Sequence, residues 1–358
     1  KLYRLTRKNY SASGRIDWEP DSDNRISIRS IYTIFTDDEA RDNYIFDLDD
    51  RQGDLVANPA TCPTTVNPTP TTTGYADVCI GNTPLTGTVY GIDINQRSTL
   101  RAFRQSIWTN TLEGTHKFGD GWSLNWLGNY TRSKDDRSVI GEARWDSPST
   151  RTLRPTLVYD FTNPVFNTPK LFTTVQLASP TRYQAGTPVT AIDTFAKPLS
   201  SLRVLDAIDT TDAYTARLVV ARDLPLLGGD ATIKLGFQFD QRTKTVDESQ
   251  ILLNTAAQYN SVGIPTDYNL FSLDRPFLGK IPMGYTFRYF DTAKMRQVSD
   301  AARQNFVFTP NTGNIYDVRE QVFAGFAMGT VRYDWGSILG GVRVEHLKNR
   351  GIAEATVA

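Results

Sequence analysis

The stretch ATIKLGFQFD at residues 231–240 decides the fold class once it is compared with the rest of the chain. Its apolar side chains fall at every second position: Ile233, Leu235, Phe237 and Phe239. The positions between them are polar, charged or small: Lys234, Gly236, Gln238 and Asp240. Because successive side chains of a strand point to opposite faces, this spacing predicts a strand with one apolar and one polar face. Soluble sheets and membrane barrels both contain such strands.

Length and composition exclude several classes of protein. The chain has 358 residues, of which 39% are hydrophobic, and it carries 39 basic and 39 acidic residues. This balance gives no field that would attract a nucleic acid, and we expect no nucleic-acid partner. No run approaches the roughly 18 apolar residues that a membrane helix needs. The chain begins at Lys1 without a signal-peptide pattern, so we expect a mature segment or a fragment.

Four pairs of alternating runs, each joined by a short turn, predict four antiparallel hairpins. The turns read EPDSDN, GDG, PLLGG and DWGS. The runs on either side are about 10 to 18 residues long, and they occupy 10–35, 100–133, 213–240 and 319–346. The run at 100–118 fits neither phase of the alternation cleanly.

Long intervals separate the hairpins, at 37–99, 135–210 and 244–316. Short turns that alternate with long loops are typical of outer-membrane barrels, and about 9–11 tilted residues cross a bilayer. We therefore predict an all-β fold: a partial antiparallel transmembrane β-barrel of about eight strands in four hairpins, with long extracellular loops. Aromatic residues near the turns would then lie at the membrane interface: Trp18, Trp122, Trp126, Tyr333 and Trp335. The alternative is a soluble or surface β-sandwich binding module, in which the same aromatic residues form a core.

Three stretches carry a resemblance to a known family. The runs NYSASGRIDWEPDSDNRISIRSIYTIFTDDEARDNY (9–44) and YDVREQVFAGFAMGTVRYDWGSILGGVRVEH (316–346), with the hairpin that begins at Tyr214, resemble the barrel of a TonB-dependent outer-membrane receptor. That family usually ends the last motif with Arg-Tyr-Glu followed by Thr, whereas Val344 and His346 stand here. The segment LVYDFTNPVF (157–166) resembles sequences of the large-loop proteobacterial subgroup of these receptors, many members of which are associated with carbohydrate uptake.

The resemblance implies that residues 1–358 are part of a receptor barrel domain. The family has 22 strands and an N-terminal plug, and we expect neither the plug nor the TonB-contacting segment in this chain. It also implies a Gram-negative outer-membrane location, active import of a scarce solute (carbohydrate or siderophore-like), and energy from a TonB-type inner-membrane complex that acts through the plug. The implied partners are outer-membrane lipid and a small solute; no cofactor and no enzymatic activity are expected.

The lumen of such a barrel is predicted to hold four charged residues on the polar phase of consecutive hairpins: Arg217, Asp240, Arg343 and Glu345. A charge at membrane depth must be hydrated or paired. These side chains either hold the plug or line the solute path, or they form ion pairs in the lumen wall with no role in transport.

Cysteines and histidines offer little chemistry. Cys62 and Cys79 lie in the first long interval, and two cysteines of an exported loop are expected to form a disulfide. No His or Cys companion favours a metal site. His116 and His346 lie far apart in sequence, and we expect hydrogen-bonded or interfacial histidines rather than a catalytic pair.

Two further segments lie in the long intervals. The acidic run TDDEARDNYIFDLDDRQGD (36–54) is either a solvated loop top or an extracellular mouth that attracts cationic or hydroxyl-rich ligands. A glycosidase would need two carboxylates held across a cleft, and no spacing here fixes such a pair. The segment DTAKMRQVSDAARQNF (291–306) has apolar residues at helical spacing, which indicates a short helix over the pore or ordinary loop packing.

Overall fold

Eight long strands dominate the computed structural model, which describes residues 1–47, 55–56, 78–80, 85–163, 165, 169–176, 183–277 and 284–353. These strands form one antiparallel sheet in which each strand pairs with the next long strand along the chain. In sheet order they are β1 (Leu2–Asp21), β2 (Asn24–Asp47), β6 (Asp93–Phe118), β7 (Trp122–Asp146), β11 (Leu199–Leu226), β12 (Gly229–Leu253), β16 (Tyr316–Tyr333) and β17 (Gly336–Ala353). A short strand, β15 (Thr309–Pro310), also pairs with β12.

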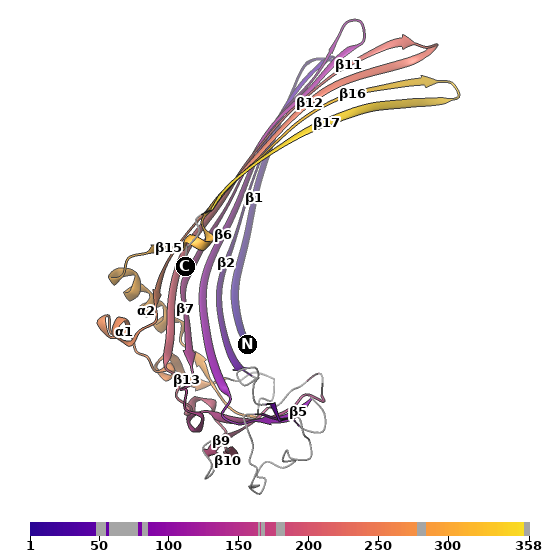
Figure 1. Ribbon diagram of the computed structural model, residues 1–358. Helices are drawn as coiled ribbons and strands as arrows, with labels where there is room; N and C mark the ends of the chain where they lie inside the picture. The colour runs from indigo at the N-terminus through magenta and orange to yellow at the C-terminus, as the bar shows by residue number, and fades with distance from the viewer. Residues whose placement is uncertain are drawn as a thin grey trace.

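The sheet is a strongly curved, open ribbon, as Figure 1 shows, with the four hairpin turns at one end and the long connections at the other. Within the described residues, β1 and β17 form the two edges, since each pairs with one long strand only. The predicted arrangement of eight long antiparallel strands in four hairpins is confirmed.

The hairpin turns lie where the sequence predicts them, and two of them show why. The two-residue turn between β11 and β12 consists of Leu227 and Gly228, whose φ angles are 56° and 73°. Asp120 and Gly121, before β7, have φ angles of 62° and 75°. In the two-residue turn, positive φ at both residues matches the twist of the flanking strands, and in both turns a glycine adopts positive φ without strain.

The strands are longer than predicted: they contain 18 to 28 residues, and all except β16 and β17 exceed the expected 18. β2 continues to Asp47 and so includes most of the acidic run at 36–54. The first half of that run is therefore a strand, neither a solvated loop top nor a loop at an extracellular mouth. Asp37, Glu39 and Asp42 are strand residues with 4%, 5% and 7% of their surface exposed. Arg7 bonds to Asp37 at 3.2 Å, Tyr3 and Arg101 each bond to Glu39 at 2.6 Å, and Ser98 bonds to Asp42 at 2.6 Å. Cross-strand partners therefore form ion pairs or hydrogen bonds with carboxylates that an isolated loop would leave in water.

Smaller elements cover the end of the sheet that lies far from the turns (Figure 1). A second sheet has the order β10-β9-β8-β5-β4-β3. Its strands are β3 (Leu55–Val56), β4 (Val78–Ile80), β5 (Thr86–Val89), β8 (Pro155–Asp160), β9 (Lys170–Gln176) and β10 (Tyr183–Pro188). Short 3-10 helices lie at η2 (Arg151–Leu153), η3 (Ile192–Thr194) and η5 (Thr312–Asn314).

The connection between β12 and β16 folds into what we call the cap, residues 254–277 and 284–315. It contains α1 (Ala256–Ser261), η4 (Tyr268–Phe271), a hairpin of β13 (Ser272–Pro276) and β14 (Arg288–Phe290), and α2 (Thr292–Asn305). Among the described residues, no helix is long and apolar enough to span a bilayer.

Helix α2 confirms the helical spacing predicted at 291–306. Asp291 caps its first turn by accepting hydrogen bonds from the backbone nitrogens of Ala293 (2.9 Å) and Lys294 (3.1 Å). Its buried side chains recur every three or four residues: Met295, Val298, Ser299 and Ala302. These pack onto the sheet in a core that contains strand residues from β6, β7, β11 and β12: Leu100, Ala143, Trp145, Leu199, Leu202, Val204, Ile251 and Leu253.

Candidate membrane-facing surface and lumen wall

Register divides the long strands into two faces. We call the face that carries Phe237 and Phe239 the apolar face, and the face that carries Gln238 and Asp240 the polar face. Residues directly opposite each other in the ladder share a face, so Leu218 lies with Phe237 and Arg217 lies with Gln238. The same rule carries both faces across all eight strands.

Aromatic side chains on the apolar face form two rows. The row farther from the turns, the outer girdle, consists of Tyr10, Tyr32, Trp108, Tyr130, Tyr214, Phe239 and Phe323. Neighbouring rings touch, with centroids 6.1 Å apart for Trp108 and Tyr130, 5.0 Å for Tyr130 and Tyr214, and 4.9 Å for Phe239 and Phe323. The row near the turns, the turn-side girdle, consists of Trp18, Phe118, Trp122 and Tyr333.

Both girdles are staggered along the sheet. The register line through Tyr10 reaches β16 at Asp317, six residues from Phe323. Six residues span about 20 Å and the six strand spacings about 29 Å, so the outer girdle runs at about 35° to the perpendicular of the strands. The line through Trp18 reaches β16 at Gly325, eight residues from Tyr333, which gives about 43° in the same direction. Strands of membrane barrels tilt by about 35–45°, so both girdles lie level in a membrane.

The two girdles enclose an apolar band of the height that a membrane requires. Trp122 and Tyr130 are eight residues apart on β7, about 27 Å along the strand and about 21 Å along the membrane normal at this tilt. The rings themselves extend the band towards the roughly 25 Å typical of outer-membrane barrels. Exposed aliphatic side chains fill it, including Ile16, Ile28, Leu112, Leu218, Leu235 and Val344.

Polar side chains inside this band bond to one another. The Nε1 of Trp126 donates to His116 Nε2 at 3.0 Å, and His116 Nδ1 lies 2.8 Å from Asn24 Oδ1. Ser30 donates to Asn110 at 2.8 Å. Satisfied polar groups are tolerated in hydrocarbon, whereas unsatisfied ones cost several kcal/mol. These bonds explain why the run at 100–118 looks irregular in sequence.

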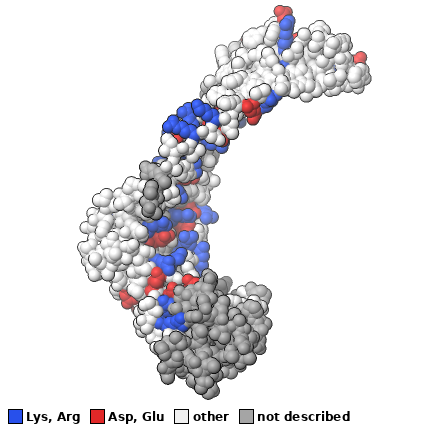
Figure 2. Space-filling view, in the orientation of Figure 1, with Lys and Arg blue, Asp and Glu red and all other residues white. Residues whose placement is uncertain are grey.

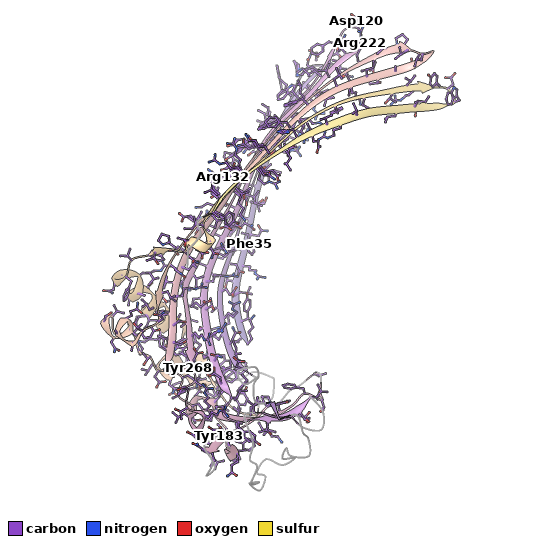
Figure 3. All side chains as sticks on the ribbon, viewed as in Figure 1. Phe35, Asp120, Arg132, Tyr183, Arg222 and Tyr268 are labelled. Atoms are coloured by element: carbon purple, nitrogen blue, oxygen red, sulfur yellow. The ribbon has the colours of Figure 1, made fainter. Side chains whose placement is uncertain are left out.

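Four of the five predicted interface aromatics lie near the turns. Trp18, Trp122 and Tyr333 belong to the turn-side girdle, and Trp335 sits in the last turn with its ring stacked 5.1 Å from that of Tyr333. Arg222, which Figure 3 labels near the turns, lies over the ring of Trp122, 5.0 Å from its centroid. Trp126 lies four residues farther from the turn than Trp122, midway between the two girdles, and its Nε1 donates to His116. Sequence reasoning missed the outer girdle as a row, because only the cross-strand register brings its members together.

The polar face is concave near the turns. One hollow there is lined mainly by polar-face residues of strands from β1 to β16, among them Arg15, Ser27, Glu113, Asn125, Arg217 and Lys234. A single hollow can reach this many strands only if the sheet curves around it. An interior that is polar and an exterior that is apolar is the arrangement of a membrane barrel.

The four predicted lumen residues share the polar face, but the structure does not join them into one cluster. Arg343 Nε lies 2.6 Å from Glu345 Oε1, and both side chains are about half exposed. Asp240 accepts hydrogen bonds of 2.6 Å from Thr215 and from Gln238. Arg217 lines the hollow. Their predicted roles in holding a plug or guiding a solute remain predictions.

The cap packs on the apolar face, not over the polar one. Gly141 is opposite Leu100 in the ladder, and a Cβ at Gly141 would lie 2.1 Å from Ser299 Oγ and 2.8 Å from Met295 Cε. Arg303 of α2 bonds to Asp206, an apolar-face residue, at 2.8 Å. The interpretation of α2 as a helix over the pore is therefore wrong, because α2 covers the outward side of the strands beyond the outer girdle.

Between β2 and the cap lies an aromatic pocket, lined by Tyr44 and Phe46 of the strand and by Tyr268, Phe287 and Arg288 of the cap. Burial raises the pKa of Tyr268 to about 12, so its hydroxyl stays neutral. Arg288 is held by Asp193, with Nε and Oδ2 3.5 Å apart. The strand residues of this pocket point to the outward side, so the pocket does not open onto the lumen wall.

The predicted disulfide cannot be placed, since Cys62 lies outside the described residues; Cys79 falls in β4. In the described part of the chain, no three His, Cys, Asp or Glu side chains gather as metal ligands would.

Two girdles, a lipid-height apolar band and a concave polar face define a transmembrane β-barrel protein of the outer membrane. Comparison with known proteins agrees: residues 234–357 match an outer membrane protein beta-barrel family. No curated protein and no solved structure matches the chain. The protein resides in the outer membrane, and the soluble β-sandwich alternative does not fit an apolar face left open to solvent along eight strands.

Proposed function

We propose that this chain forms part of the barrel wall of a TonB-dependent receptor, which imports a scarce solute through the outer membrane with energy from an inner-membrane complex. One observation carries the proposal: charged side chains stand on the polar face at the depth of the apolar band. Arg217 and Lys234 lie there on neighbouring strands, and Asp240 stands at the level of the outer girdle beside Phe239. Charges at membrane depth require water or another part of the protein beside them, and a plugged, solute-conducting lumen supplies both.

The resemblance to receptor barrels in 9–44 and 316–346 supports the energy-dependent version of this function over a passive pore. A carbohydrate or a siderophore-like chelate is the proposed solute. Catalysis is no part of the proposal.

Uptake by cells that express the complete protein tests the proposal. A panel of labelled oligosaccharides and iron chelates is offered with and without collapse of the inner-membrane proton gradient. We expect surface binding of one solute to persist and its uptake to stop when the gradient collapses. Equal uptake under both conditions would identify a passive channel and contradict the proposal.

The pair Arg343 and Glu345 tests the role of the lumen wall. Replacing both by Ala should leave binding at the loops within about twofold and lower uptake, because the polar face loses a charged contact beside the solute path. The control variant exchanges the two residues, Arg343→Glu with Glu345→Arg, and keeps an ion pair at the same place. Wild-type uptake in the double Ala variant would leave the pair with no role in transport.

A further inference from the structure

Lysine and arginine gather on the apolar face just beyond the outer girdle. This set, the cation stripe, consists of Lys8, Arg104, Arg132, Lys134, Arg319, Lys348 and Arg350. Figure 2 shows the basic side chains concentrated at the narrow middle of the molecule, where Figure 3 labels Arg132. Their strand positions follow the same stagger as the aromatic girdle, so the stripe lies level with the surface of the membrane.

Most of the stripe is not neutralised. Arg132 pairs with Asp212 at 3.0 Å, and Lys134 lies 3.7 Å from Asp136. Lys8, Arg104, Lys348 and Arg350 are exposed, and no carboxylate among the described residues forms an ion pair with them. Unpaired cations that face outward at headgroup level attract anionic lipid.

An apolar notch lies directly below the centre of the stripe. Gly128 and Ala216 are opposite each other in the ladder, and a Cβ at Gly128 would meet nothing within 4 Å. Larger side chains surround the gap, on the same two strands and on strands beside them: Tyr130, Tyr214, Ile28, Leu112 and Phe239. Two small residues side by side thus leave a groove in an otherwise filled lipid-facing surface.

Notch and cations lie in the order that a lipid molecule requires. Arg132 is four residues from Gly128 along β7, about 13 Å, and Tyr130 stands between them. An acyl chain in the notch would pass Tyr130 and Tyr214 at the interface and bring a headgroup to Arg132 and Lys134, with Arg104 one strand away. Phosphate suits these donors, because arginine binds it through two parallel hydrogen bonds.

We propose that this surface binds a phosphorylated lipid of the outer leaflet, with an acyl chain in the notch at Gly128 and Ala216 and a headgroup phosphate on the cation stripe. This binding is independent of solute transport. It would anchor the barrel at a fixed height in the leaflet, below the cap that α2 forms on the same face.

The test measures lipid phosphorus per protein after the complete protein is extracted from outer membranes with mild detergent. The variant Arg104→Glu with Lys134→Glu reverses two charges of the stripe, and each lost cation near a membrane surface is worth about fivefold in lipid binding. We expect at least a fivefold loss of retained phosphorylated lipid. The matched control, Arg29→Glu with Arg242→Glu, reverses two exposed cations of the polar face and should retain the wild-type amount.

Filling the notch gives a second variant that leaves all charges in place. Ala216→Leu adds apolar bulk and should also lower lipid retention without impairing assembly. Equal retention in wild type, stripe variant and notch variant would overturn the proposal, as would equal loss in the polar-face control. Displacement of the lipid by millimolar inorganic phosphate would reduce the surface to a simple anion site and contradict a lipid held through its acyl chain.

Discussion

An arginine placed at Leu235 should destabilise the protein more than an arginine at the other exposed apolar-face positions of β12 within the membrane band. Leu235 lies on the apolar face with 57% of its surface exposed. The outer girdle crosses β12 at Phe239, and the turn-side girdle, interpolated between Trp122 and Tyr333, crosses it near Ala231. Leu235 is therefore at the middle of the apolar band, and Phe237 is one step closer to the surface.

The expected costs follow from this depth. Arginine at the midplane of a barrel's lipid-facing side costs about 2–4 kcal/mol, and near the interfaces the cost falls to about 0–1 kcal/mol. Leu235→Arg should cost the full amount, Phe237→Arg about half of it, and Phe239→Arg close to nothing. Gln238→Arg is the matched control, because it places the same side chain on the polar face of the same strand.

Equilibrium unfolding of the protein from phospholipid vesicles measures these differences, and assembly in the outer membrane gives an independent reading. The order Leu235, then Phe237, then Phe239 is the result that the girdle positions require. Comparable losses for Leu235→Arg and Gln238→Arg would refute the assignment of faces. A flat cost across the three apolar positions would refute the position of the girdles.

Three other predictions concern the region beyond the membrane. Burial lowers the pKa of Lys197 to about 8, so between about pH 8 and pH 10.5 the unfolded chain keeps a proton that the folded chain loses. The free energy of unfolding should therefore rise over this pH range, by at most about 3 kcal/mol. Urea unfolding measures this rise, and the variant Lys197→Met should lack it. Gly141→Val should displace α2 from the sheet, since Ser299 occupies the space of a Cβ, and limited proteolysis should then cut the cap faster than in wild type. Cys62 and Cys79 should be recovered as a disulfide by mass spectrometry of unreduced peptides, and two free thiols would refute that pairing.

Much of the fold could be predicted from the sequence because alternation is a local property. The run 231–240 shows its two faces without any partner strand. The turn at Leu227 and Gly228 could be predicted because two consecutive glycines, Gly228 and Gly229, follow Leu227 in the sequence. Strand length could not be predicted in the same way. Asp37 and Glu39 look like loop residues until Arg7 and Arg101, which are distant in sequence, are seen to pair with them.

The candidate site shows the same division between local and long-range information. Trp18, Trp122 and Tyr333 could be assigned to an interface because each stands beside a turn. The outer girdle lies in mid-strand, and its members are aligned only by the register. The helix at 291–306 could be predicted from the spacing of its apolar residues. The face of the sheet that it covers could not, because the helix packs where Gly141 of β7 has no side chain and leaves room for Ser299.

Spin labels placed singly at residues 231 to 241 of β12, in a background with both cysteines replaced by serine, test the central claim most directly. Collisions with oxygen report lipid exposure, and collisions with a water-soluble nickel complex report the aqueous lumen. The two-faced barrel wall predicts that odd positions favour oxygen, with a maximum at 235, and that even positions favour nickel. The same accessibility at neighbouring positions, or a maximum displaced to the ends of the scan, would contradict it.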